Sequence, residues 1–249
     1  MNFTGERLVP DMPILTNMIV EELGRLNFAK HYFQRVPALD FGCGTGYAAN
    51  FMFEQGAATV VGIDISSEAI SFAQKRYSCD KLSYARMSCL NVALASGTFG
   101  FICSLDVIEH FEETDTNCFI SEIVRLLLPG GWCLITTPNK VCSSPNSKTP
   151  SWEYHRKEFF YDEFRAVLQN HFKTVEIYGG RVPVYEDRLI RKVTRSPLSN
   201  IKHFLPAKIR VGFSSGLRYL LKAQLTIEDV VISKENVEKS RVFLALCQK

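Results

Sequence analysis

The stretch SLDVIEHFEE, residues 104–113, places two carboxylates and an imidazole within five positions, at Asp106, Glu109 and His110. It directly follows the apolar run FGFICSL. If the stretch begins helically, these side chains lie at i, i+3 and i+4 and share one face of a turn. Three interpretations stay open: a general base with orienting carboxylates, a divalent-metal site, or a helix start whose polar residues are only solvated.

As a general base, His110 would remove a proton while Glu109 or Asp106 orients its ring. As a metal site, the mixed oxygen and nitrogen donors suit Mg²⁺ or Mn²⁺ better than they suit a sulfur-rich zinc site. A metal that chelates two vicinal oxygens would lower the pKa of a hydroxyl and position it.

Short apolar segments alternate with amphipathic ones along the chain, and the strands and helices that they predict determine where residues 104–113 lie. We predict strands at 36–42, 58–64, 81–87, 99–105, 132–139, 173–180 and 240–249, and helices at 47–56, 66–77, 116–128 and 159–172. Such alternation predicts a doubly wound α/β fold with a mostly parallel, seven-stranded sheet. In these sheets the ligand crevice lies outside the carboxyl ends of the strands, where residues 40–46, 64, 88–89 and 105–110 fall.

The chain divides into four expected parts. Residues 1–35 form an N-terminal helical segment, 36–180 the core, 181–240 a basic helical insert, and 241–249 the final core strand. The Pro- and Ser-rich loop at 143–155 is expected to form a rim of the crevice. Helix 66–77 opens with Ser66 or Ser67 as its N-cap.

Composition excludes several classes of protein. The chain has 249 residues, a net charge of +3 that is too small to favour nucleic acid, and eight cysteines. No cysteine pair has C-x-x-C spacing, so a zinc ribbon or a redox dithiol is not expected. The sequence shows neither a secretory h-region nor an apolar run of about 18 residues. We therefore expect a cytoplasmic protein with reduced thiols.

The segment DFGCGTGY places Gly42, Gly44 and Gly46 in a strand-to-helix turn, where glycine permits positive φ and close approach of a ligand. The dinucleotide fingerprint G-x-G-x-x-G would need a small residue where Tyr47 stands. This position weighs against an NAD-dependent oxidoreductase.

Together, ALDFGCGTGY and VVGIDIS resemble the first two motifs of class I S-adenosylmethionine-dependent methyltransferases. The resemblance implies a Rossmann-like fold in which Asp40 and the glycine turn hold the amino-acid end of the cofactor and Asp64 accepts hydrogen bonds from both ribose hydroxyls. The cofactor-binding residues it implies are Asp40, Gly42, Cys43, Gly44, Gly46, Asp64, Ile65, Ser88, Cys89 and Leu105. Ser88 and Cys89 replace the acid that usually binds the adenine amino group, and Gly100 replaces a usual aspartate.

Later segments resemble the families that methylate small molecules and cell-surface sugars, and FTGERLVP resembles a leader of bacterial methyltransferases in polysaccharide biosynthesis. The pattern D-x-x-E-H is similar to the E-x-x-E-H of ubiquinone-biosynthesis O-methyltransferases, with Asp106 in place of the first glutamate. It also resembles that of small-RNA terminal 2′-O-methyltransferases, which add a downstream histidine. This second resemblance implies His155 as a fourth member of a catalytic or metal-binding set with Asp106, Glu109 and His110.

The predicted activity is S-adenosylmethionine-dependent methyl transfer (EC 2.1.1.-) to an oxygen of a small molecule or a sugar or glycan intermediate. One alternative is a metal-dependent O-methyltransferase, using Mg²⁺ or Mn²⁺, that acts on a vicinal diol, a catechol-like acceptor or an RNA 3′-end. A second alternative is a non-catalytic S-adenosylmethionine-binding protein. Nucleic acid is not the expected partner.

Residues 181–222 hold ten basic residues against two acidic ones, with apolar residues interleaved. This mixture fits peripheral contact with an anionic membrane, a basic cover over an acidic acceptor, or a helical lid with a solvated basic face. The first possibility extends the expected location to the inner membrane face.

Overall fold

The computed structural model describes residues 8–10, 16–182 and 225–249. Its helices and strands lie in the chain order α1 (Thr16–Phe28), α2 (Lys30–Phe33), β1 (Pro37–Phe41), α3 (Tyr47–Glu54), β2 (Thr59–Asp64), α4 (Ser67–Tyr77), β3 (Leu82–Arg86), β4 (Phe99–Leu105), η1 (Ile108–His110), α5 (Glu113–Leu126), β5 (Leu127–Pro138), α6 (Lys140–Ser143), α7 (Tyr161–Gln169), β6 (Thr174–Arg181), η4 (Ile227–Asp229), β7 (Val231–Ser233), η5 (Val237–Lys239) and β8 (Val242–Gln248).

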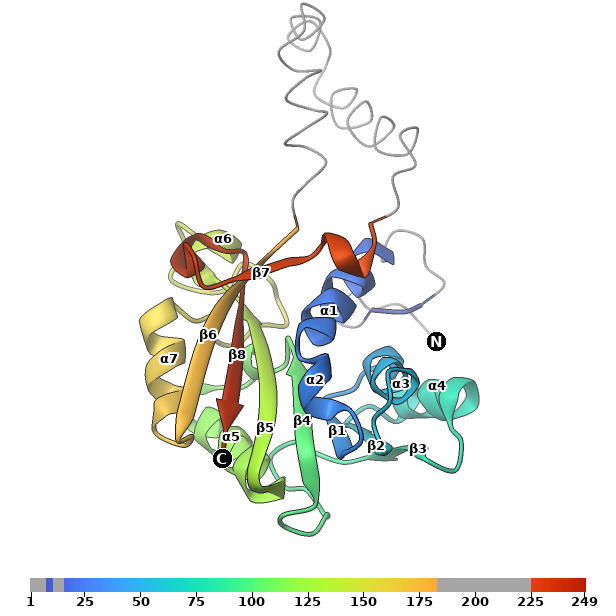
Figure 1. Cartoon of the computed structure of the whole chain (residues 1–249). Coiled ribbons are helices and arrows are strands. Elements are labelled where there is room, and N and C mark those ends of the chain that lie inside the picture. Colours follow the sequence, from blue (N-terminus) through green and yellow to red (C-terminus); the bar gives the residue numbers. More distant parts are fainter. Residues whose placement is uncertain (1–7, 11–15, 183–224) are drawn as a thin grey trace, which may run out of the picture.

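The strands form one sheet in the order β3-β2-β1-β4-β5-β8-β6-β7 (Figure 1). Strands β1 to β5 pair in parallel, whereas β8 runs antiparallel between β5 and β6. The predicted doubly wound α/β fold is confirmed, and all seven predicted strands are present. The structure adds an eighth, β7, inside the stretch expected to be a helical insert. Its Val231 and Ile232 extend the sheet because β6 continues to Arg181 and offers it a paired edge.

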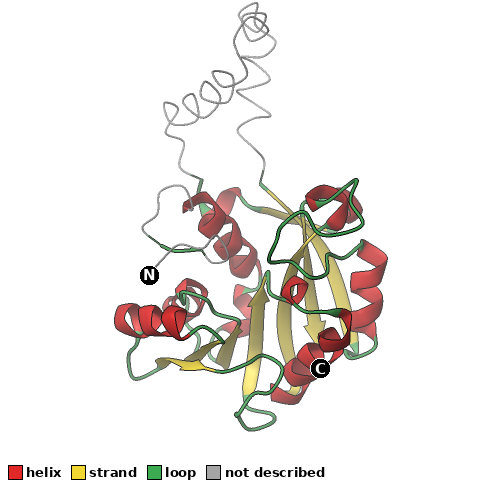
Figure 2. Cartoon of the chain, turned by 180° about the vertical axis from the view of Figure 1, so that it is seen from behind, coloured by secondary structure: helices red, strands yellow, loops and turns green. Residues whose placement is uncertain are grey.

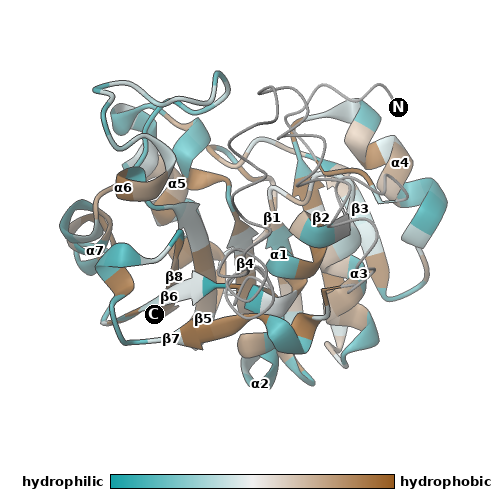
Figure 3. Ribbon diagram, turned by 90° about the horizontal axis from the view of Figure 1, so that it is seen from above, coloured by the Kyte–Doolittle hydropathy of each residue, from teal (hydrophilic) through white to brown (hydrophobic). Residues whose placement is uncertain are grey.

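Helices cover both faces of this sheet, as Figure 2 shows from behind. On one face, α5 and α7 bury Phe119, Ile123 and Phe164 against the strands. On the other, α1 to α4 bury a separate cluster that includes Phe33 and Met52. Figure 3 looks down on this arrangement, with α5 and α7 on one side of the sheet and α3 and α4 on the other. Burial of both faces explains the nearly continuous apolar strand sequences.

The predicted helical segment before the core appears as α1 and α2. Helix α1 packs so closely on η4 that a Cβ at Gly24 would lie 2.3 Å from Val230 Cγ2. The glycine is therefore needed for this approach, which fixes the position of α1 over the sheet.

Apart from Arg181 and Val182, the basic segment 181–222 lies outside the described residues, and so do its predicted roles as lid, substrate cover or membrane contact. In the part of the chain that the structure describes, no helix is both long enough and apolar enough to cross a bilayer.

Candidate active site

A cleft of about 660 Å³ opens at the carboxyl ends of β1, β2 and β4. The sequence-predicted residues that line it are Gly42, Cys43, Gly44, Asp64, Ile65, Ser88, Cys89, Leu105, Asp106, Glu109, His110 and His155. Thr45 and Val107 also line it from the segments expected at the crevice, as do Ser143, Ser151 and Trp152 from the loop expected at its rim. The lining residues that sequence reasoning missed are Leu8, Met18, Glu22, Tyr47, Phe111, Pro138 and Glu158. Two predicted cofactor residues, Asp40 and Gly46, do not line it.

The glycine turn forms the floor of one end of the cleft. Gly42, Gly44 and Gly46 have φ of +89°, +49° and +84°, a region that other residues rarely adopt. A Cβ at Gly42 would lie 2.7 Å from Val107 Cγ2, and one at Gly46 would lie 2.7 Å from Ala73 Cβ. Glycine is required here by both backbone conformation and space.

Asp64, at the end of β2, points into the same end of the cleft. Its Oδ2 accepts the Gly44 N–H at 2.9 Å and its Oδ1 accepts the Ser66 N–H at 2.8 Å. A carboxylate oxygen has a second lone pair, so a carboxylate held in this way still offers two acceptors side by side to a diol. The Ser66 hydroxyl in turn accepts the Ala69 N–H, which identifies Ser66 as the N-cap of α4.

Three small or apolar side chains, those of Ile65, Ser88 and Cys89, also line the cleft. Ile65 is 62% exposed, whereas Cys89 is 7% exposed. Burial raises the pKa of the Cys89 thiol, so this residue contributes a neutral surface at physiological pH. An apolar surface with few charges suits a nucleobase better than a phosphate.

Asp40 lies behind the glycine turn, and its side chain does not reach the cleft. Its Oδ1 accepts a hydrogen bond from Cys103 Sγ at 3.5 Å, while its Oδ2 is buried with no hydrogen-bond partner. Burial raises the pKa of Asp40 to about 7, although the hydrogen bond from Cys103 opposes the shift. The structure thus places this residue under the turn, whereas Glu22 of α1 lines the cleft above it.

Asp106 is separated from its expected partners. It has φ of +52°, so the chain turns through a left-handed residue before η1 instead of starting a helix at Asp106. Its carboxylate receives Arg25 Nη1 and Nη2 at 2.9 and 2.8 Å, and the Thr136 hydroxyl at 2.7 Å. Burial disfavours the charged carboxylate, but the Arg25 charge and these hydrogen bonds hold the Asp106 pKa below its usual value. Asp106 therefore anchors α1 to the sheet.

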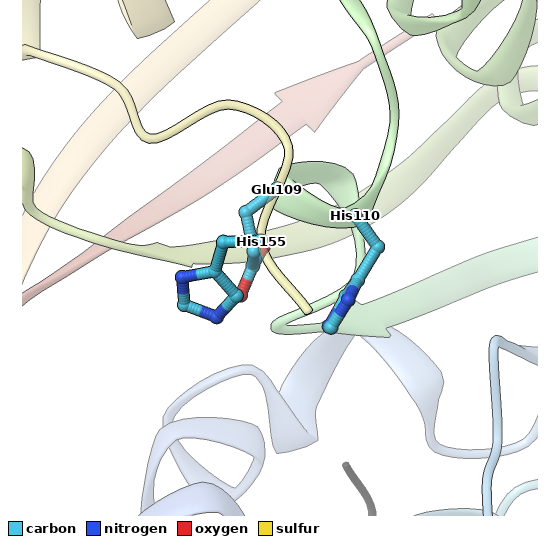
Figure 4. A group of neighbouring side chains, drawn as sticks. All are labelled: Glu109, His110 and His155. Atoms are coloured by element: carbon cyan, nitrogen blue, oxygen red, sulfur yellow. The ribbon is translucent and has the colours of Figure 1, made fainter. Parts of the chain in front are cut away.

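Glu109, His110 and His155 do come together (Figure 4). One ligand atom from each lies within 4.8 Å of the others, and His155 Nε2 is 4.0 Å from Glu109 Oε1. The chain reaches this arrangement because the Glu109 carbonyl accepts the N–H groups of Arg156 and Lys157, which docks the 143–158 loop onto η1.

The partners of the two imidazoles define their tautomers. His155 Nδ1 lies 3.0 Å from Glu158 Oε1, and His110 Nδ1 lies 3.0 Å from the Tyr154 carbonyl oxygen. A carbonyl or carboxylate oxygen only accepts, so we assign the proton of each ring to Nδ1. Each Nε2 then carries a lone pair.

Glu109 is fully buried, and its two carboxyl oxygens differ. Oε2 accepts the Thr137 hydroxyl at 3.0 Å, whereas Oε1 has no hydrogen-bond partner. Burial, with the nearby charge of Asp106, raises the Glu109 pKa well above its usual value. Burial therefore favours the neutral form of the Glu109 carboxyl group, and a cation or a protonated imidazole beside Oε1 would favour the charged form.

Sequence reasoning missed both Glu158 and Arg25, but only Glu158 has a visible signal in the sequence. The H-x-x-E spacing of His155 and Glu158 is visible in EYHRKEF, and it brings the side chains together locally. Arg25 lies 81 positions from Asp106, so no pattern in the sequence marks this pair.

Comparison with known proteins agrees with this geometry. A family model described as "Methyltransferase domain" matches residues 39–135. The chain is 29% identical over 175 residues to a probable S-adenosylmethionine-dependent methyltransferase of Mycolicibacterium smegmatis, covering 67% of this chain and 63% of the relative. It is 35% identical over 109 residues to a ubiquinone biosynthesis O-methyltransferase of Thiobacillus denitrificans, covering 43% and 46%. These matches span less than two thirds of either relative.

Solved structures show the same fold. Phosphoethanolamine N-methyltransferase 2 of Haemonchus contortus, in complex with S-adenosyl-L-methionine, superposes with a TM-score of 0.60 at 18% identity, covering 99% of this chain and 59% of that one. The G-x-G-x-G turn and the strand-end Asp64 lie where such a fold places its ligand crevice. On these grounds residues 39–135 form a methyltransferase domain, and the chain is similar to S-adenosylmethionine-dependent methyltransferases.

Proposed function

We propose that the protein transfers a methyl group from S-adenosylmethionine to a hydroxyl oxygen of a small acceptor without negative charge. The observation that carries this proposal is the His155–Glu158 pair at the cleft, with Nδ1 and Oε1 3.0 Å apart. A carboxylate that holds Nδ1–H orients the ring and makes Nε2 a stronger base. A hydroxyl acceptor needs such a base.

The cleft fits the cofactor, which supplies an electrophilic methyl group on a sulfonium. The positive-φ glycines give close access to the backbone, Asp64 offers paired acceptors for ribose hydroxyls, and Cys89 lines a neutral surface for the base. About 660 Å³ is within the usual range for a pocket that holds a drug-sized ligand.

His155 Nε2 would take the hydroxyl proton as the acceptor oxygen bonds to the methyl carbon and the carbon–sulfur bond breaks, which leaves S-adenosylhomocysteine as the product. The resulting imidazolium would face Glu109 Oε1, which lies 4.0 Å from Nε2 and has no other hydrogen-bond partner. The charge that develops on the ring would thus be stabilised by a group already positioned for it. This arrangement favours His155 as the base over His110, whose Nδ1 partner is a neutral carbonyl.

The charge of the cleft indicates the class of acceptor. Among residues 8–10, 16–182 and 225–249, no lysine or arginine lines it, whereas five carboxyl groups do. Met18, Phe111 and Trp152 add apolar surface. A neutral phenol, quinol or sugar hydroxyl suits such a lining better than a phosphorylated compound, because nothing in the described lining would compensate a phosphate.

Two measurements test the proposal. Calorimetry should show binding of S-adenosylhomocysteine and none of NAD; absence of S-adenosylhomocysteine binding would overturn the proposal. Methyl-tritiated S-adenosylmethionine should then label members of a panel of neutral catechols, quinols and sugars, in preference to matched amines and phosphate monoesters. Preferential labelling of amines or phosphate esters would contradict the assignment of the acceptor.

A metal-assisted form of the same reaction is the second candidate, because Glu109, His110 and His155 present three ligand atoms within 4.8 Å. Asp106 is not among these ligands, since Arg25 and Thr136 occupy its carboxylate. With two imidazole nitrogens, the set suits Mn²⁺ better than Mg²⁺. Calorimetric titration of the wild type and of His155→Ala with Mn²⁺ distinguishes the candidates. Saturable binding that His155→Ala abolishes supports the metal, and lack of binding leaves the base mechanism.

A further inference from the structure

We infer that Glu22 of α1, and not Asp40 of the glycine motif, binds the α-ammonium group of the cofactor. The inference rests on the proposed use of S-adenosylmethionine and goes beyond it, because it assigns a binding role to the N-terminal helix.

Glu22 is positioned beside the glycine turn by contacts from two elements. It is 8% exposed and lines the cleft. Its Oε2 accepts a hydrogen bond from the hydroxyl of Tyr47, the residue that follows Gly46. Its Oε1 lies 3.9 Å from Arg25 Nη2. These contacts hold the carboxyl group over the turn.

The order of the strands tells which end of the cofactor meets Glu22. Strand β1, which leads into the glycine turn, lies between β2 and β4. Asp64 ends β2 and marks the ribose side, whereas Asp106, the anchor of Arg25, follows β4. Glu22 precedes Arg25 by one helical turn and so lies toward β4. A cofactor that spans the turn from its ribose at Asp64 would bring its amino-acid end to Glu22.

Packing on the far side of the helix maintains this direction. Gly24 contacts η4 closely, and it stands two positions from Glu22, which is about 200° around a helix. The Val230 side chain therefore holds the opposite surface of α1. With the Arg25–Asp106 pair as a second attachment, the helix has little freedom to withdraw Glu22 from the cleft.

The electrostatics of Glu22 favour a cationic ligand. Burial and the charge of Asp106 raise its pKa to about 8, although Arg25 and the Tyr47 hydroxyl lower it and Asp40 adds to the rise. Arg25, whose Nη2 lies 3.9 Å from Glu22 Oε1, donates hydrogen bonds from both of its terminal nitrogens to Asp106. An ammonium group bound at Glu22 would add a further positive charge beside the carboxyl group, which would then lose its proton.

Binding measurements with two ligands test the inference. S-adenosylhomocysteine has the amino-acid end, and 5′-methylthioadenosine is the same thioether nucleoside without it. We expect Glu22→Gln to weaken S-adenosylhomocysteine about 10- to 100-fold while 5′-methylthioadenosine changes less than about 3-fold, since a hydrogen bond to a charged group is lost. Glu21→Gln, on the same helix but outside the cleft lining, is the matched control and should change neither.

Proton release gives an independent readout. Binding of S-adenosylhomocysteine to the wild type at about pH 7.5, measured calorimetrically in buffers of different ionisation enthalpy, should release roughly half to one proton, and Glu22→Gln should release close to none. Unchanged affinity in Glu22→Gln, equal weakening of both ligands, or unchanged proton release would overturn the inference. Failure of the wild type to bind S-adenosylhomocysteine would instead overturn the proposed function.

Discussion

The two ends of the cleft differ in whether backbone or side chains form them. At the end that we propose to bind the cofactor (the cofactor end), backbone conformation dominates: three positive-φ glycines and a strand-end aspartate lie within residues 42–64. At the end that we propose to bind the acceptor (the acceptor end), side chains dominate, and they come from η1, β5 and the 143–158 loop. A backbone turn encoded by adjacent residues tolerates change elsewhere, whereas a side-chain cluster depends on every segment that contributes to it.

Two acidic residues near that cluster show how much position matters. Asp106 and Glu109 are three positions apart, yet Asp106 is held charged by Arg25 while Glu109 is fully buried and its Oε1 has no partner. The pKa of the first falls and that of the second rises. The difference separates an anchor of the fold from a group available for chemistry.

The largest expected effect is confined to the acceptor end. His155→Ala should lower kcat for methyl transfer by about 10²- to 10⁴-fold, because the proposed general base is lost. The affinity for S-adenosylhomocysteine should stay within about 3-fold of the wild-type value, because His155 is not part of the cofactor end. His171→Ala, a histidine outside the cleft lining, is the control. Equal loss of affinity and rate would contradict the separation of the two ends.

Arg25→Met tests the attachment of α1 beneath both ends. Removing the cation leaves Asp106 uncompensated, and we expect about 2–4 kcal/mol less stability in chemical denaturation. The expected loss is smaller than for a fully buried ion pair, because the Asp106 side chain is 23% exposed and water can partly solvate it. Adding Asp106→Asn should recover part of the loss. No loss in Arg25→Met would show that the pair is not an anchor.

Asp40→Asn tests the buried acid behind the glycine turn. The folded-state pKa of about 7 exceeds the unfolded value near 3.8, so the wild type loses stability as pH rises from about 4 to 7. The Asn variant has no such titration. We compare the free energy of unfolding of Asp40→Asn with that of the wild type at two pH values. Between about pH 4 and about pH 8, the difference should shift by about 2–4 kcal/mol in favour of the variant. Thermal denaturation at both pH values measures this, and a constant difference would show that Asp40 stays ionised.

The smallest effect concerns a local feature of the cofactor end. Ser66→Ala removes the hydroxyl that accepts the Ala69 N–H and should lower stability by about 1 kcal/mol. Ser67→Ala, the exposed neighbour, should stay within about 0.5 kcal/mol. Denaturant unfolding distinguishes the two, and equal effects would contradict the assignment of the N-cap to Ser66.

Much of the fold was predictable because it follows from local patterns. Apolar strand segments, amphipathic helices and the glycines between them indicate the doubly wound sheet and place the cleft at its carboxyl ends. The short β7 was not predictable, since only the continuation of β6 to Arg181 gives it an edge to pair with. The helical turn predicted from Asp106 to His110 was wrong at its first residue, where Arg25 binds the carboxylate and the backbone is left-handed.

The sequence by itself determined the glycine turn, because Gly42, Gly44 and Gly46 and the strand-end Asp64 encode a backbone shape over a short span. Only the tertiary structure decided which carboxylates are free for chemistry. The contacts of Asp106 and Glu22 come from segments distant in the chain. Burial and neighbouring charges set the ionisation of such groups, and neither is visible in the order of the residues.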